Sequence, residues 1–206
     1  PLFSEISKRY YSSQNGFQLS REAMSQLHQA SMWYSEEHSC NKSLLPVQLR
    51  QECFTNFCSS ENTSSKLQYD IVQAFRSLPP YLGVFVIEEE SRCQRTGYSI
   101  DVLIGVQQQK VAVEIDGPCH FIGFSPNGAT MLKQRQLCSL GTTPLLSIPY
   151  WEWDMLSSNS DNNTNNIMMN NMWNGTSNYD PYHHYNNELR LKQSYLQQRL
   201  QQASFL

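Results

Sequence analysis

The sequence lacks several features that would place it in a familiar class. Its 206 residues contain no run of 18 or more apolar residues, which excludes a membrane-spanning helix. Six cysteines are scattered without a C-x-x-C pair, so we expect neither a zinc ribbon nor a zinc finger and predict reduced thiols. The chain begins at Pro1 without a charged and apolar leader, and we expect it to be part of a longer product.

Charge is also scarce, because only 16% of the residues are charged and the net charge is −3. Residues 61–156 hold ten acidic and seven basic side chains, so this segment alone carries a net charge of −3. Nonspecific affinity for nucleic acid comes mainly from Lys and Arg that neutralise phosphates. We therefore expect tight RNA binding here only with metal ions, a basic helical region upstream, or a protein partner.

Composition divides the chain into four segments. Residues 1–60 carry helical patterns and are predicted to be the end of a larger helical region. Residues 61–156 are predicted to form a compact α/β unit. In 157–187, 11 of 31 residues are Asn, which predicts a disordered insertion. Residues 188–206 return to an amphipathic helical pattern that docks either on the core or on a partner.

The α/β unit is predicted to follow the order α-β-β-β-α-β. Its strands are nearly continuous apolar runs, as in sheets that are covered on both faces. Two consecutive prolines end the first helix, and a glycine ends the second. The predicted helices are Ser65–Ser77 and Asn127–Leu140, and the predicted strands are Tyr81–Glu88, Tyr98–Val106, Lys110–Asp116 and Leu145–Ile148.

Acidic residues inside these apolar strands are the informative exceptions. Asp101 interrupts one strand, while Glu114 and Asp116 share one face of the next, about 7 Å apart. If the two strands pair, three carboxylates converge and must be protonated, hydrogen-bonded or neutralised by a cation. Mg²⁺ held by Asp101 and Glu114 is one solution. A purely structural network, or contact with RNA without cleavage, are the alternatives.

Other polar and aromatic residues follow these strands. His120 could act as a general base or donate to phosphate, and it could also be a packing histidine. Lys133 and Arg135 could pair with the acids or hold an RNA phosphate, and they could also be exposed helix charges. Three aromatic residues could stack on RNA bases or seal the edge of the sheet: Tyr150, Trp151 and Trp153.

A combination of motifs over about residues 66–156, a little under half of the chain, resembles a known family. The segments are Gly97–Asp101, Val111–Phe121, Thr130–Lys133 and Ile148–Trp153, together with Leu137 and Gly141. This combination resembles the RAP domain. RAP domains occur at the C-termini of organellar RNA-metabolism proteins, including the FAST-kinase-like family and many apicomplexan and algal proteins.

The resemblance implies a restriction-endonuclease-like fold, close to that of very-short-patch-repair nucleases. By position it assigns Asp101, Glu114 and Asp116 to an acidic metal site, and His120 to the histidine of the patch-repair-like branch. The usual nuclease pattern has Lys two residues after the strand acid, where this chain has Asp116. Lys133 is the candidate to replace that lysine, which makes it the fifth candidate catalytic residue.

These observations lead to three functional hypotheses. The first is an RNA-binding or docking module of a mitochondrial or other organellar protein that processes RNA or associates with ribosomes. Its ligand would be organellar mRNA or rRNA, its partners helical repeats or other subunits, and no membrane is expected. The second is a Mg²⁺-dependent RNA endonuclease using Asp101, Glu114 and His120. The third is a constitutive protein-facing subunit of a mitochondrial ribosome. The organellar location follows from the resemblance alone.

Overall fold

The computed structural model describes residues 2–12, 18–37, 44–59, 64–141, 143–157 and 181–205. Most of the predicted Asn-rich insertion lies outside these residues. In the described part of the chain, no helix combines the length and apolar character needed to cross a membrane.

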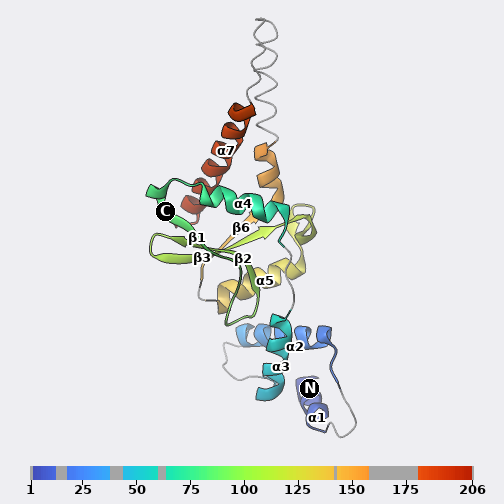
Figure 1. Cartoon of the computed structure of the whole chain (residues 1–206). Coiled ribbons are helices and arrows are strands. Elements are labelled where there is room, and N and C mark those ends of the chain that lie inside the picture. The colour runs from blue at the N-terminus through green and yellow to red at the C-terminus, as the bar shows by residue number, and fades with distance from the viewer. Residues whose placement is uncertain are drawn as a thin grey trace, which may run out of the picture.

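A mixed sheet of four strands forms the centre of the molecule, in the order β1-β2-β3-β6 (Figure 1). The strands β1 (Val84–Arg92), β2 (Ser99–Val106) and β3 (Gln109–Asp116) are antiparallel neighbours. β6 (Leu145–Pro149) lies parallel to β3 on its other side. A parallel neighbour requires a crossover connection, and the polypeptide between β3 and β6 supplies it.

Helices precede the sheet and form its crossover. α4 (Lys66–Arg76) comes before β1, and Ser65 caps it by accepting from the Gln68 backbone N–H. α5 (Gly128–Leu140) lies between β3 and β6, and Asn127 caps it in the same way. The predicted α-β-β-β-α-β order is therefore observed as a mixed α/β structure. The restriction-endonuclease-like fold stays a prediction.

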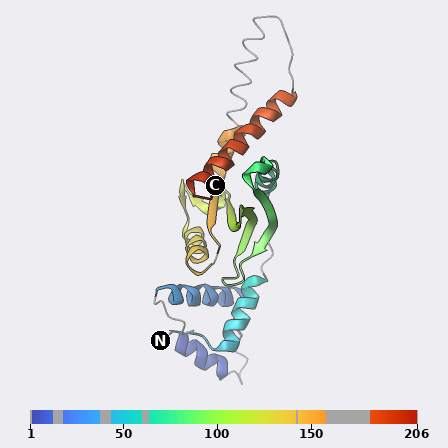
Figure 2. The same ribbon diagram turned by 90° about the vertical axis from the view of Figure 1, so that its left-hand side faces the viewer.

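Side-chain alternation in β3 distributes its residues between two packed layers. Val111, Val113 and Ile115 enter the main core with α4 and the C-terminal helix, whereas Ala112 packs with Leu137 of α5. Figures 1 and 2 show α5 on the opposite side of the sheet from α4. Since Glu114 and Asp116 have the same parity as Ala112, they lie on the α5 face of the sheet.

The C-terminal helix α7 (Pro181–Gln202) closes the main core. Its Leu196 and Leu200 are fully buried there beside Trp153, which belongs to the helical segment 150–157. The alternative in which this helix docks on the core is thus the one observed. α7 begins at Pro181 rather than at residue 188 as predicted, and proline is favoured in a first helical turn.

Three helices at the N-terminal end form a smaller layer: α1 (Leu2–Tyr11), α2 (Arg21–Glu37) and α3 (Val47–Cys58). Their own core contains Leu27, Leu45, Leu49 and Cys53. The buried His28 ring of α2 joins this layer to the β1–β2 turn, since its Nε2 lies 2.7 Å from the Thr96 carbonyl oxygen.

The first strand is the element predicted least well. We expected it over Tyr81–Glu88, but Pro80–Leu82 forms a 3₁₀ turn that ends at Gly83 with φ +63°. β1 therefore begins at Val84 and continues to Arg92. The prediction of reduced thiols agrees with the five cysteines that are described, all of them unpaired.

Candidate functional site

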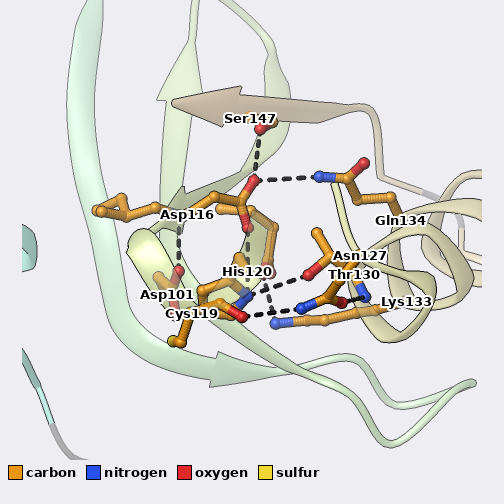
Figure 3. A network of polar contacts seen from close by, with 11 residues as sticks. Asp101, Asp116, Cys119, His120, Asn127, Thr130, Lys133, Gln134 and Ser147 are labelled. Atoms are coloured by element: carbon orange, nitrogen blue, oxygen red, sulfur yellow. Dashed lines mark hydrogen bonds and ion pairs between the residues drawn. The ribbon is translucent and has the colours of Figure 1, made fainter. Parts of the chain in front are cut away.

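The acidic residues of β2 and β3 meet where these two strands separate. Their ladder ends at the pair Val102 and Val113, so Asp101 and Glu114 are the next residues on the same face. Asp101 accepts a hydrogen bond of 2.7 Å from the Ile115 backbone N–H through Oδ2 (Figure 3). Burial raises the pKa of Asp101, and this hydrogen bond and the Lys133 charge oppose the rise.

Glu114 is almost fully buried, with 2% of the residue exposed. Its Oε2 forms an ion pair with the ammonium group of Lys133, which reaches the sheet from α5. Its Oε1 is buried without a hydrogen-bond partner among the described residues. Burial raises the pKa of Glu114 to about 8, although the Lys133 charge lowers it.

Asp116 takes part in a different set of contacts, because its Oδ2 accepts two hydrogen bonds (Figure 3). The Ser147 hydroxyl on β6 donates at 2.6 Å, and the Gln134 side-chain amide on α5 donates at 3.1 Å. Its Oδ1 lies 3.7 Å from Nδ1 of His120. Asp116 therefore occupies the sequence position of the nuclease lysine but contacts His120, while Lys133 supplies the positive charge beside Glu114.

His120 lies at the rim of the site, in the short 3₁₀ turn η2 (Pro118–His120). Asn127 holds this turn, because its side-chain amide donates to the Cys119 carbonyl at 2.8 Å and its backbone N–H donates to the His120 carbonyl at 2.8 Å. Nδ1 of His120 lies 3.2 Å from the hydroxyl oxygen of Thr130 (Figure 3). Because 40% of the His120 side chain is exposed, a bound ligand can reach it.

The charges of the site are largely compensated by protein groups. Among the described residues, no cluster of three or more His, Cys, Asp or Glu side chains has the arrangement of a metal site. Lys133 contacts Glu114, and hydrogen bonds from Ser147 and Gln134 stabilise Asp116. The orphaned Oε1 of Glu114 is the one feature of these carboxyl groups that fits a further cation or donor.

Four aromatic residues form a cluster that begins, in the sequence, at the residue after His120. This aromatic ridge consists of Phe121, Phe124, Tyr150 and Trp151. The ring centroids of Phe121 and Trp151 are 4.3 Å apart, and those of Phe124 and Trp151 are 5.3 Å apart. Phe124 lies in the turn between β4 (Phe121–Ile122) and β5 (Ser125–Pro126), and 77% of it is exposed. The other three rings are half-buried, and contiguous apolar clusters that reach the surface mark binding sites more often than scattered single residues do.

Two predicted RNA-contacting residues have other partners. Trp153 is 2% exposed in the main core and donates to Asp70 through its indole N–H, so its ring has no face for a base. The Arg135 guanidinium lies 3.1 Å from Glu36 on α2, and this acid is its partner in place of the strand acids. Both outcomes follow from packing that local sequence patterns do not contain.

Sequence reasoning missed several residues that the site uses. Ser147 interrupts the apolar strand β6 beside Glu114 in the β3–β6 register, and this interruption is the same signal that identified Asp101. Thr130 lies in a segment that carries the family resemblance but was assigned no role there. Gln134 and Asn127 had no signal of their own, because polar residues are common on helices and at caps. Phe124 could have been noticed as an aromatic residue next to Gly123, since glycine favours turns.

The site geometry can be compared with known domain families. Residues 113–167 match the family model of the RAP domain. The matched region includes Glu114, Asp116, His120 and Lys133, together with the whole aromatic ridge. Asp101 precedes it, and so does α4.

Proposed function

Because the chain contains a RAP domain, a family of RNA-binding domains, we propose that it docks single-stranded RNA on the aromatic ridge beside His120. The proposal further assigns it to an organellar, mitochondrial protein that processes RNA or associates with ribosomes. This location is supported by the family resemblance of its motifs. The bound RNA would be an organellar mRNA or rRNA segment that is not base-paired.

The aromatic ridge, in which Phe124 is exposed and the other three rings are half-buried, is the observation that carries this proposal. Unpaired bases stack on aromatic side chains, and each stacked base contributes about 1–3 kcal/mol to binding. Phe124 and Trp151 contact each other edge to face, and most of the Phe124 ring is open to solvent. The ridge begins at the residue after His120, so a base on it lies next to a side chain that can form hydrogen bonds.

The cations near the ridge contribute little to this mode of binding. Lys133 is held by Glu114 and Arg135 by Glu36, so neither side chain can move to a phosphate without losing that contact. Affinity should therefore depend on stacking and hydrogen bonds, with a shallow dependence on salt concentration. Helical repeats or other subunits would supply the remaining affinity and the sequence readout.

Fluorescence anisotropy with labelled single-stranded RNA tests the proposal. Phe124→Ala and Trp151→Ala should each weaken binding about tenfold, as expected for one lost stacking interaction. Tyr81→Ala is the matched control, because Tyr81 is an aromatic residue that is 81% exposed on the 3₁₀ turn before β1. Equal affinities of all four proteins, with unchanged circular dichroism, would refute docking on the ridge.

A Mg²⁺-dependent RNA endonuclease is the second candidate, and the orphaned Oε1 of Glu114 favours it. Asp101 and Glu114 are the residues that would hold the ion, which when bound would activate a water and stabilise the phosphate charge. Lys133 would keep Glu114 in place, and His120 at the rim would exchange a proton with the reacting groups.

Incubation with structured RNA and Mg²⁺ or Mn²⁺ separates the two candidates. If the protein is an endonuclease, the wild type should cut the RNA, and a folded variant that combines Asp101→Ala and Glu114→Ala should not. RNA that stays intact with a folded wild-type protein would leave the binding module as the function.

A further inference from the structure

His120 has two ring nitrogens in different surroundings. Nδ1 is turned inward, 3.2 Å from the Thr130 hydroxyl oxygen and 3.7 Å from Oδ1 of Asp116. Thr130 and Asp116 are both almost fully buried, whereas 40% of the His120 side chain is exposed. The Cδ2 edge of the ring lies over Gly117. Nε2 has no hydrogen-bond partner among the described residues and is not one of their buried unpartnered atoms, so it belongs to the exposed part of the ring.

Asp116 can offer His120 only one of its two oxygens. Oδ2 accepts from Ser147 at 2.6 Å and from Gln134 at 3.1 Å, and these two donors fix the rotation of the carboxylate. Oδ1 is consequently held on the side of Nδ1. A negatively charged oxygen beside Nδ1 stabilises a proton on that nitrogen, and the hydrogen bond made by one ring nitrogen determines the role of the other.

We propose that Asp116 is a positioning residue that keeps the His120 proton on Nδ1, so that Nε2 accepts a hydrogen bond from a ribose 2′-hydroxyl. The proposal rests on the docking of RNA proposed above, because it concerns a nucleotide held at the adjacent ridge. A neutral acceptor nitrogen binds a hydroxyl but does not attract a phosphate. The pair would thus distinguish RNA from DNA, which lacks this hydroxyl.

Asp116→Asn is a sharp test because the surroundings determine how the new amide is oriented. Ser147 and Gln134 both donate, so they hold the amide oxygen in the place of Oδ2. The amide nitrogen then takes the place of Oδ1 and presents a donor to Nδ1. This donor should move the ring proton to Nε2, which removes the acceptor without removing the ring.

Two measurements follow from this exchange. In ¹⁵N NMR spectra of the free protein, neutral His120 should carry its proton on Nδ1 in the wild type and on Nε2 in Asp116→Asn. The affinity ratio between an RNA and a DNA strand of the same sequence should fall about fivefold, as expected for one lost hydrogen bond. His120→Ala removes the acceptor entirely and should lower the ratio equally.

Asp154→Asn is the control, since Asp154 is an exposed acid in the helical segment 150–157 and its replacement removes the same charge. It should change neither the tautomer nor the affinity ratio. An unchanged tautomer in Asp116→Asn would overturn the positioning role, and a changed tautomer with an unchanged ratio would overturn the hydroxyl contact. A wild type that binds RNA and DNA equally refutes this inference alone, whereas no RNA binding at all refutes the proposed function as well.

Discussion

Replacing Glu114 by Gln measures what it costs to bury this carboxyl group beside two other acids. The unfolded chain releases the proton at a pKa near 4.5, whereas burial in the folded protein raises the pKa of Glu114 to about 8. Between these values the folded state binds the proton and the unfolded state does not. The contribution of this group to stability is therefore fully present below pH 4.5 and is lost progressively as the pH rises toward 8.

The expected magnitude follows from the two pKa values. A tenfold difference in proton affinity is worth about 1.4 kcal/mol, so the wild type loses about 2–3 kcal/mol between pH 5 and pH 7 through this group. Gln does not titrate and loses nothing by this route. The amide that replaces the carboxyl group would carry its own unpaired groups, but that cost is the same at both pH values and cancels in the difference.

Urea unfolding of the full chain at pH 5 and pH 7 provides the assay. Relative to the wild type, Glu114→Gln should gain about 2–3 kcal/mol of unfolding free energy on going from pH 5 to pH 7. Glu5→Gln is the control, because the Glu5 side chain is 54% exposed and pairs with Arg9 on the surface. If the unfolding free energies of the wild type and of Glu114→Gln change equally between pH 5 and pH 7, burial does not raise this pKa and the reasoning fails.

Three further substitutions test the packing around the site. Trp153→Ala should lower the unfolding free energy by about 3–5 kcal/mol, because Trp153 is 2% exposed in the main core; urea unfolding measures this loss. Lys192→Met should cost about 1–2 kcal/mol and lower the thermal midpoint, since it removes the buried ammonium 2.6 Å from the half-exposed Asp70. In the same urea assay, Gly97→Ala should lower the unfolding free energy more than Gly123→Ala does. Both glycines have positive φ, but only at Gly97 would a Cβ lie 3.1 Å from side chains of α3.

Much of the fold around the sheet could be predicted from the sequence. The runs that became β2 and β3 are long, apolar and bounded by polar turns, so their limits were predicted within one residue. The alternation in β3 also predicted that Glu114 and Asp116 share a face. The start of β1 was predicted too early because Tyr81 and Leu82 fit a strand by composition. In the structure both belong to a 3₁₀ turn that ends at Gly83, so the strand begins after it.

The connections within the site could be predicted only in part. The pairing of Lys133 with an acid was one of the alternatives that the sequence left open, since a helix after β3 must return over the sheet. That Asp116 contacts His120, Ser147 and Gln134 depends on how β6 aligns with β3 and how α5 is rotated. Local periodicity contains neither quantity, so the division of the acids into two sets of contacts required the structure.

The closure of the main core by α7 has a consequence for how this fold can vary. Leu196 and Leu200 lie far beyond the stretch that matches the RAP family, yet they are as buried as the strand residues they contact. The Asn-rich stretch separates the two parts in sequence. The entropy of closing such a connection grows only with the logarithm of its length, so doubling it costs about 0.6 kcal/mol. A change in the length of this stretch should therefore cost little stability as long as the same helix still completes the hydrophobic interior.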